Sequence, residues 1–218
     1  SYDDIKKAIH ECKRSEIDIG AVCVVNIAGR ASKELIKIQE ICKNEKIPLV
    51  EDNAQGMLSK LSEKQLGTFS DFSASSFQTT KVIACGEGGI IQVKNEEDYE
   101  NIKNFIFYGR SKKNNLLFDE ESGNFKLSEL NAALALADFE RSKKRISRRN
   151  EIDSLYASDV KSTYFHYLKS PLNNITSNYK TIFMAHSSHL RNTIEKHFRS
   201  NNFLSMCFYW ENLKKQVR

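Results

Sequence analysis

The sequence has few of the residues that mark several classes of protein. Two prolines and nine glycines among 218 residues exclude a collagen-like or low-complexity chain. No apolar run is long enough to cross a membrane, and no charged-then-apolar leader opens the chain. The five cysteines form no CxxC pair and are odd in number, which favours a reducing cytoplasm over a disulfide framework. These absences, with 40% hydrophobic residues, predict a soluble globular chain.

Neither the charge balance nor the spacing of the histidines gives reason to expect a polyanionic partner or a metal ion. The chain has 33 basic and 28 acidic residues, a formal net charge of +5. One basic cluster wraps around a predicted helix instead of lining one face, so we expect no nucleic-acid binding by its members, Lys143, Lys144, Arg145, Arg148 and Arg149. His186 and His189 are three residues apart but lack a third ligand nearby in sequence, so we predict no metal site.

Short apolar runs alternate with helical patterns in the first half of the chain. Residues 21–27 and 47–50 read as buried strands, and residues 71–77 and 89–93 as two more. Between the first two strands, apolar residues recur at helical spacing after Ser32, a suitable N-cap. The strand–helix–strand order predicts an α/β fold with a mainly parallel sheet covered by helices.

The second half has a different organisation. Helical patterns cover residues 96–107 and a long stretch from Leu127 into the polar segment 141–151. Residues 179–184 and 203–209 read as strands and residues 190–200 as a helix, which together predict a small α+β unit. We therefore divide the chain into part of a large domain at residues 1–125, a connecting helix at 126–160 and part of a small domain at 161–218.

Polar residues stand where the predicted strands end, which is where open parallel sheets bind ligands. Glu51 and Asp52 follow one strand, Ser76 and Lys81 follow another, and a glycine-rich turn, GEGG, comes after them at residues 86–89. Each feature alone has an ordinary explanation as a loop cap, a solvated charge or a hairpin turn. Together, in this order, they suit pyridoxal phosphate, which needs an amine for its aldehyde, an acid for its pyridine nitrogen and donors for its phosphate.

At these residues the chain resembles the DegT-like family of pyridoxal-phosphate-dependent nucleotide-sugar aminotransferases, which have fold type I, the aspartate aminotransferase type. The resemblance runs from VVNIAGR (residues 24–30) through EDNAQ (51–55), SFQTTK (76–81), GEGG (86–89) and FYGR (107–110) to GNFKLSELNAALAL (123–136). After about residue 160 only the pattern of elements matches. EDxAQ followed by SFxxTK and GEGG is a much more specific signature than any one of its parts.

The resemblance implies a role for each matching residue. Lys81 holds the cofactor aldehyde as a Schiff base and moves the proton during transamination, and Asp52 pairs with the pyridine nitrogen, with Glu51 as the next candidate. Gln55 lies beside the ring, Ser76 binds the phosphate, and Asn124 reaches the phosphate of a neighbouring subunit's cofactor. The implied protein is a homodimer with shared active sites that moves an amino group from an amino acid, with glutamate as the expected donor, to a keto group of a nucleotide-activated sugar.

Departures from the family pattern keep two alternatives open. Asn26 replaces a usual His and Lys126 a common Arg. Family chains also begin earlier, with a Gly-Thr loop that binds the cofactor phosphate, so these 218 residues could form a non-catalytic or incomplete fragment that binds pyridoxal phosphate weakly and associates through uncovered apolar strands. A sugar dehydratase of the same family is the second alternative, but a His replaces the lysine there, and Lys81 counts against it.

Overall fold

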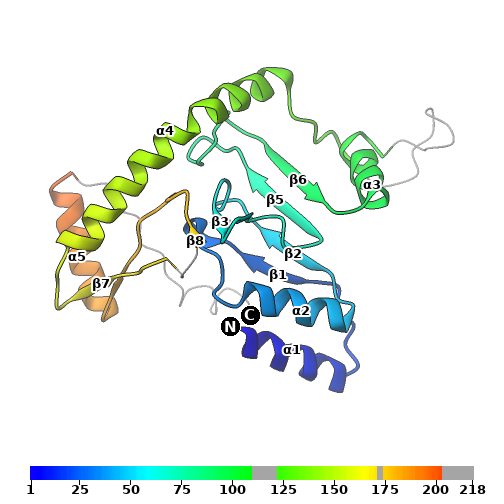
Figure 1. The fold of residues 1–218 in the computed structure, drawn as a ribbon, viewed down its shortest axis with the longest axis horizontal. Coiled ribbons are helices and arrows are strands. Elements are labelled where there is room, and N and C mark those ends of the chain that lie inside the picture. Colours follow the sequence, from blue (N-terminus) through cyan, green and yellow to red (C-terminus); the bar gives the residue numbers. More distant parts are fainter. Residues whose placement is uncertain (110–121, 171–173, 203–218) are drawn as a thin grey trace. The chain divides into compact units, whose positions relative to one another are not determined.

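A computed structural model describes residues 1–109, 122–170 and 174–202 (Figure 1). Its contacts divide the chain into two units, Ser1–Asp153 with Ser170–Thr181, and Ser154–Lys169 with Ile182–Arg218. The five candidate cofactor-binding residues all lie in the first unit. The predicted domain limits at residues 125 and 160 are not tested by this division and stay a prediction.

A four-stranded sheet forms the centre of the first unit. Its strands are β1 (Val22–Val25), β2 (Leu49–Asp52), β5 (Phe72–Ser76) and β6 (Gly89–Val93), in the order β1-β2-β5-β6 (Figure 1). The β1–β2 and β2–β5 pairs are parallel, and β6 returns antiparallel to β5. The predicted α/β fold with a mainly parallel sheet is confirmed.

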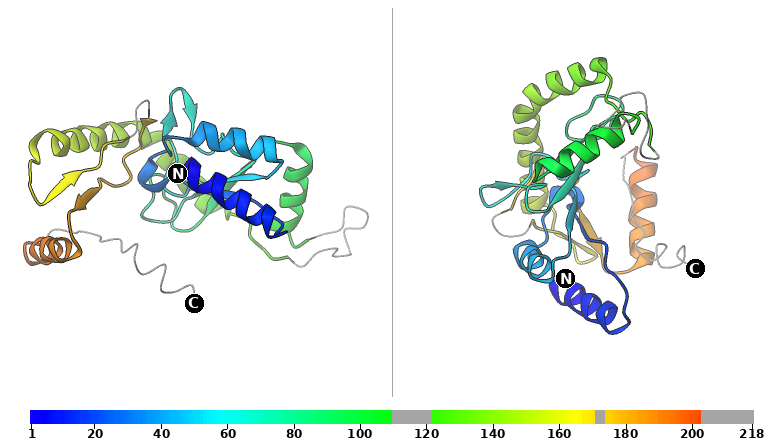
Figure 2. Two further views of the ribbon diagram at one scale, coloured as in Figure 1. Left: turned by 90° about the horizontal axis from the view of Figure 1, so that it is seen from below. Right: turned by 90° about the vertical axis from the view of Figure 1, so that its right-hand side faces the viewer.

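Two helices lie side by side next to this sheet, α1 (Tyr2–Arg14) and α2 (Leu35–Glu45) (Figures 1 and 2). One face of α2 packs against one face of the sheet and the loop after it, and the buried members of this apolar cluster are Val24, Ala31, Leu35, Ile38, Cys42, Leu49, Leu66 and Phe69. A second buried cluster consists of Phe77, Ile83, Cys85 and Ala135. The expectation that Ser32 caps α2 is wrong, because the N-cap is Glu34. The Ser32 hydroxyl instead accepts a hydrogen bond from the Glu34 N–H in a tight turn before the helix.

The other face of the sheet is largely open in the described part of the chain. Val25 is 53% exposed, Ile91 is 48% exposed, and Cys23 and Ala74 are also exposed. The interpretation of residues 21–27 as a buried strand is therefore wrong for Cys23 and Val25, and the strand itself is limited to Val22–Val25. Successive residues of a strand point to opposite faces, and α2 covers only one of them.

The remaining elements of the first unit frame the strand ends. A 3-10 turn, η1 (Ile27–Gly29), follows β1, and a small antiparallel sheet joins β3 (Lys60–Leu61), β4 (Lys64–Gln65) and β8 (Asn174–Ile175). Helix α3 (Glu96–Ile106) follows β6, and the long helix α4 is Glu129–Asp159. No helix of the described residues is both long and apolar enough to span a membrane.

The second unit is small and built from local contacts. Strands β7 (Phe165–Tyr167) and β9 (Phe183–Ala185) pair antiparallel, and α5 (Ser188–Ser200) follows. Phe183 contacts the rings of Tyr156, Phe165 and Tyr167 edge-on. The predicted strand at residues 179–184 begins only at Phe183, because residues 176–181 pack into the first unit instead. The predicted strand at residues 203–209 lies outside the described residues.

Candidate active site

Asp52 and Ser76 end two adjacent parallel strands and face the same side of the sheet. Asp52 is opposite Ala74 in the register of β2 and β5, and Ser76 lies two residues further along β5. Both side chains are half-buried. The only hydrogen bond of the Asp52 carboxylate to described residues comes from the Ala54 N–H at 3.0 Å. One carboxylate and one hydroxyl thus stand at the carboxyl edge of the sheet with most of their hydrogen-bonding capacity uncommitted to the chain.

Lys81 lies in the loop that joins β5 to β6. Main-chain hydrogen bonds connect the two arms of that loop. Phe77 N donates to Gly88 O, Cys85 N to Phe77 O, and Thr79 N to Gly86 O, at 2.8 to 2.9 Å. The glycine of the return is needed for close approach, because a Cβ on Gly89 would lie 2.7 Å from the carbonyl oxygen of Ser75. Lys81 thus lies in the loop that follows the carboxyl end of β5, and β5 is the neighbour of β2, which ends at Asp52.

The amine of Lys81 is not committed to any acidic partner. Its Nζ lies 5.2 Å from the ring centroid of Tyr179 and makes no hydrogen bond or ion pair with the part of the chain that the structure describes. The Tyr179 hydroxyl is 3.0 Å from Oγ1 of Thr80, so the ring is held next to the lysine. The sequence analysis did not find Tyr179, because 98 residues separate it from Lys81 in the sequence and no motif surrounds it.

The side chain of Gln55 bonds to the turn that follows β1. Its Oε1 accepts a hydrogen bond of 2.9 Å from the N–H of Ala28, whose φ of 55° puts it in the left-handed region within η1. The side chain therefore ties the turn after β1 to the turn after β2. Its amide nitrogen makes no hydrogen bond to any of the described residues, so it is free to donate.

Glu51 has a different role from Asp52, although the two are neighbours in sequence. The Glu51 side chain faces the α2 side of the sheet and is completely buried. Its carboxylate accepts five hydrogen bonds of 2.8 to 3.0 Å, from the N–H groups of Gly67, Phe69 and Ser70, the hydroxyl of Ser70 and the amide of Asn26. All of its acceptor positions are used within the protein, so the expectation that Glu51 could replace Asp52 at the cofactor is wrong.

Asn26, which departs from the family pattern, belongs to the same buried network. Its Nδ2 donates to Glu51 at 2.9 Å and to Oδ1 of Asn53 at 3.1 Å. Asn53 in turn donates to the Leu66 carbonyl and to the Ser75 hydroxyl. The network fixes the ends of β1, β2 and β5 relative to one another from the buried side, directly behind the face that carries Asp52 and Ser76.

Asn124 is placed apart from the other four candidates. It forms an isolated antiparallel bridge with Phe107, beyond the end of α3, and its side chain is exposed. No hydrogen bond links it to Asp52, Gln55, Ser76 or Lys81 within the described residues. Nearby, Nζ of Lys126 lies 4.2 Å from the ring centroid of Phe107 and 5.2 Å from that of Tyr108. Four of the five candidates thus lie at or after the carboxyl ends of the neighbouring strands β2 and β5, whereas Asn124 lies elsewhere on the surface.

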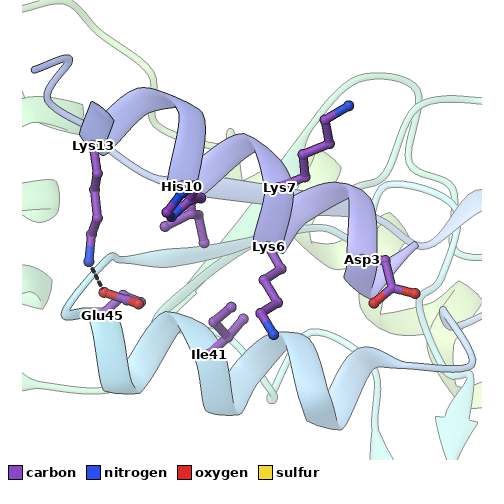
Figure 3. A pocket seen from close by; sticks show the side chains of 8 residues that line it. Asp3, Lys6, Lys7, His10, Lys13, Ile41 and Glu45 are labelled. Atoms are coloured by element: carbon purple, nitrogen blue, oxygen red, sulfur yellow. Dashed lines mark hydrogen bonds and ion pairs between the residues drawn. The ribbon is translucent and has the colours of Figure 1, made fainter. Parts of the chain in front are cut away.

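A groove of about 410 Å³ opens between α1 and α2, and it contains none of the candidates (Figure 3). Its lining is mostly charged and comprises Asp3, Lys6, Lys7, Ile9, His10, Lys13, Ile41 and Glu45. Figure 3 shows Lys13 reaching Glu45 across the groove in an ion pair. Most of these side chains are exposed, so the groove is a surface feature and we draw no site from it. Among the described residues no group of three His, Cys, Asp or Glu side chains could hold a metal ion.

Comparison with known proteins shows which family this arrangement comes from. The model of the DegT/DnrJ/EryC1/StrS aminotransferase family matches residues 1–217. The chain belongs to this family. A curated relative, the UDP-4-amino-4,6-dideoxy-N-acetyl-beta-L-altrosamine transaminase of Campylobacter jejuni (serotype O:23/36, strain 81-176), is 31% identical over 171 residues, and the match covers 76% of this chain and 45% of that protein.

Solved structures at about 20% identity to this chain have the same fold. An aminotransferase of the DegT/DnrJ/EryC1/StrS family from Brucella abortus superimposes with a TM-score of 0.88 at 20% identity, covering 96% of this chain and 55% of that one. A GDP-4-keto-6-deoxy-D-mannose-3-dehydratase from E. coli, solved with hydrated pyridoxal phosphate, gives 0.81 at 20% identity, with coverage of 91% and 56%. The fold-type resemblance is confirmed. The chain spans about half the length of the relatives it matches.

Proposed function

We propose that this protein is a pyridoxal-phosphate-dependent aminotransferase that moves an amino group from an amino acid, with glutamate as the expected donor, to a keto group of a nucleotide-activated sugar. Family membership supports this proposal, as does a relative that is named a transaminase of a UDP-linked amino sugar. The observation that carries it is the uncommitted amine of Lys81 in the loop beside the strand that ends at Asp52.

The residues at the sheet edge fit the cofactor by their chemistry. A lysine amine without an acidic partner is available to react with an aldehyde, and Asp52 keeps an oxygen that no described residue occupies. The Ser76 hydroxyl accepts from Gln78 N at 3.3 Å and keeps its own proton to donate to a phosphate oxygen. No described carboxylate pairs with Lys81, so a bound cofactor would not have to break an existing ion pair.

Each residue would then act on a stated atom. When bound, the cofactor supplies an aldehyde that takes up the amino group and a ring that withdraws electrons. Lys81 would hold it covalently and, once freed by the amino donor, would carry the proton between the donor Cα and the cofactor C4′. Asp52 would keep a proton on the pyridine nitrogen, Gln55 would orient the ring edge, and Ser76 would bind the phosphate.

The proposal includes a homodimer in the cytoplasm, with Asn124 of each copy completing the other copy's phosphate site. The exposed position of Asn124, outside the sheet edge that carries the other four residues, favours a role toward a second copy. The division into parts of a large and a small domain at residues 125 and 160 belongs to the same proposal.

The test is chemical labelling of the purified protein. After incubation with pyridoxal phosphate and reduction with borohydride, peptide mass mapping should find the pyridoxyl group on Lys81. Adding glutamate before reduction should remove the label, because the donor displaces the lysine. Label on another lysine with Lys81 unmodified overturns the site, and label that glutamate leaves in place overturns the aminotransferase reaction. A keto-deoxy sugar product without incorporated nitrogen would indicate the dehydratase instead.

A further inference from the structure

Helix α4 holds the chain segment that follows Lys81. Directly after the lysine the chain becomes buried, with Val82 2% and Ile83 1% exposed. Nη2 of Arg145 donates to the carbonyl oxygen of Val82 at 2.8 Å, and the N–H of Ala84 donates to Oδ2 of Asp138 at 2.9 Å. Two α4 side chains thus satisfy a main-chain acceptor and a main-chain donor within three residues of Lys81.

Asp138 and Arg145 also pair with each other. They are seven residues apart, two turns of α4, so they share a helix face. Both Nη groups of Arg145 contact the Asp138 carboxylate, in a fork arrangement. The hydrogen bond from Arg145 holds the pKa of the Asp138 carboxyl below its usual value, and the same bond raises the pKa of Arg145. Both groups therefore remain charged, and each orients the other toward the loop.

On the N-terminal side of Lys81, the main chain is held by contacts within and next to the loop. Its N–H donates to the carbonyl of Gln78 at 2.8 Å, which closes a turn. Thr80, the residue before it, contacts the hydroxyl of Tyr179. The main chain of Lys81 is thus fixed on its N-terminal side by a turn and on its C-terminal side by α4. Because the direction of a side chain follows from its backbone, these contacts determine where the lysine amine can reach.

We infer that Asp138 and Arg145 are positioning residues that aim Lys81 at the cofactor aldehyde. This inference rests on the proposed function. In the step concerned, the Lys81 amine forms a C=N bond with the aldehyde carbon, and the aldehyde oxygen leaves as water. Neither Asp138 nor Arg145 touches the reacting atoms. Removing one of them leaves the ring and phosphate contacts at the sheet edge in place but lets the lysine backbone move.

Two ligands separate this role from general support of the fold. Pyridoxal 5′-phosphate can bond covalently to Lys81, whereas 4′-deoxypyridoxine 5′-phosphate has the same ring and phosphate but no aldehyde. In the parent protein the aldehyde should bind more tightly than the analogue. In Arg145→Gln and Asp138→Asn, affinity for the aldehyde should fall about ten- to a hundredfold, as expected for lost charge-assisted hydrogen bonds, with the analogue's affinity unchanged within about threefold.

Arg148→Gln is the matched control. Arg148 lies one turn further along α4 in an exposed ion pair with Glu151, so the ratio of the two affinities should equal that of the parent. Circular dichroism of each variant checks that it is folded. If the affinities of Arg145→Gln and Asp138→Asn fall equally for both ligands, or fall for neither, the positioning role is wrong while the proposed function stands. If the parent binds neither ligand, the proposed function itself fails and this inference fails with it.

Discussion

Asp52 and Glu51 are neighbours in sequence, but their carboxylates lie on opposite faces of the central sheet. Both carboxylates follow an apolar run, and a sequence pattern alone does not tell which of two neighbours faces the ligand. The register of β2 separates them, because adjacent strand residues point to opposite faces. The Glu51 carboxylate accepts five hydrogen bonds, four from one loop and one from Asn26. The Asp52 carboxylate accepts one from the described residues and can accept more at the sheet edge.

The first residue-scale prediction concerns Asp52→Asn. The amide cannot keep the pyridine nitrogen protonated, so the variant should bind pyridoxal phosphate within a few-fold of the parent but react with glutamate about a hundredfold or more slowly. Stopped-flow absorbance after addition of glutamate measures that rate. A rate equal to the parent's would move the role away from Asp52, and Glu51 could not take it over.

The second concerns Glu51→Gln, which should affect stability instead of chemistry. The new NH₂ group must face donors in place of one carboxylate oxygen, so we expect the free energy of unfolding to fall by about 2 to 4 kcal/mol. Glu40→Gln is the control, since Glu40 is exposed on α2, and it should change stability by less than about 0.5 kcal/mol. Urea denaturation measures both. If both variants change the free energy of unfolding by the same small amount, the buried Glu51 carboxylate is not needed for stability.

At the scale of elements, apolar spacing predicted the four strands of the central sheet and helices α2 to α5, but it missed α1 and the short strands β3, β4, β7 and β8. Strand β6 has the bounds expected from the sequence, and α3 ends one residue before its predicted limit. The start of α2 was misplaced because Ser32 looks like a cap, yet its hydroxyl bonds two residues ahead in a turn and the helix begins later. The position at which a helix begins depends on competing local hydrogen bonds, and the preference of serine for the N-cap does not determine which of them forms.

The end of α2 offers an element-scale prediction. Lys46, its C-cap, has a φ of 55°, in the left-handed region where glycine has no steric cost, and its side chain is exposed. Lys46→Gly should therefore stabilise the protein by roughly 0.5 to 1 kcal/mol. Lys43→Gly, within the last turn of the helix, should destabilise it by about 1 kcal/mol. Thermal unfolding of both variants checks the opposite signs, and a loss of stability in Lys46→Gly would contradict the capping argument.

At the scale of the whole molecule, the sequence could not reveal the contacts that assemble the strand-end loops. Residues 174–181 return to the first unit and bond to segments more than 90 positions earlier. Asn174 accepts from Ala31 N and donates to Lys60 O, Ser177 N donates to the Ser59 hydroxyl, and Tyr179 meets Thr80. Pairings at such separation leave no local periodicity, which is why Tyr179 and the α4 contacts to the lysine loop became visible only in the folded structure.

The open face of the central sheet leads to the last prediction, which concerns association. Val25 on β1 and Ile91 on β6 expose apolar side chains on the face opposite α2, where Cys23 and Ala74 are also exposed. An exposed apolar face of this kind favours contact with another surface. We expect purified protein to associate in a concentration-dependent manner, and sedimentation velocity measures this.

The double substitution Val25→Thr and Ile91→Thr keeps residues that suit strands and removes apolar surface from this face. At roughly 0.8 kcal/mol for each buried methylene-sized group, it should weaken association about tenfold or more. Ile36→Thr is the control, because Ile36 is 53% exposed on α2 and lies outside the open face. Association that weakens equally in both variants, or in neither, would show that the open sheet face is not the surface through which copies of this chain meet.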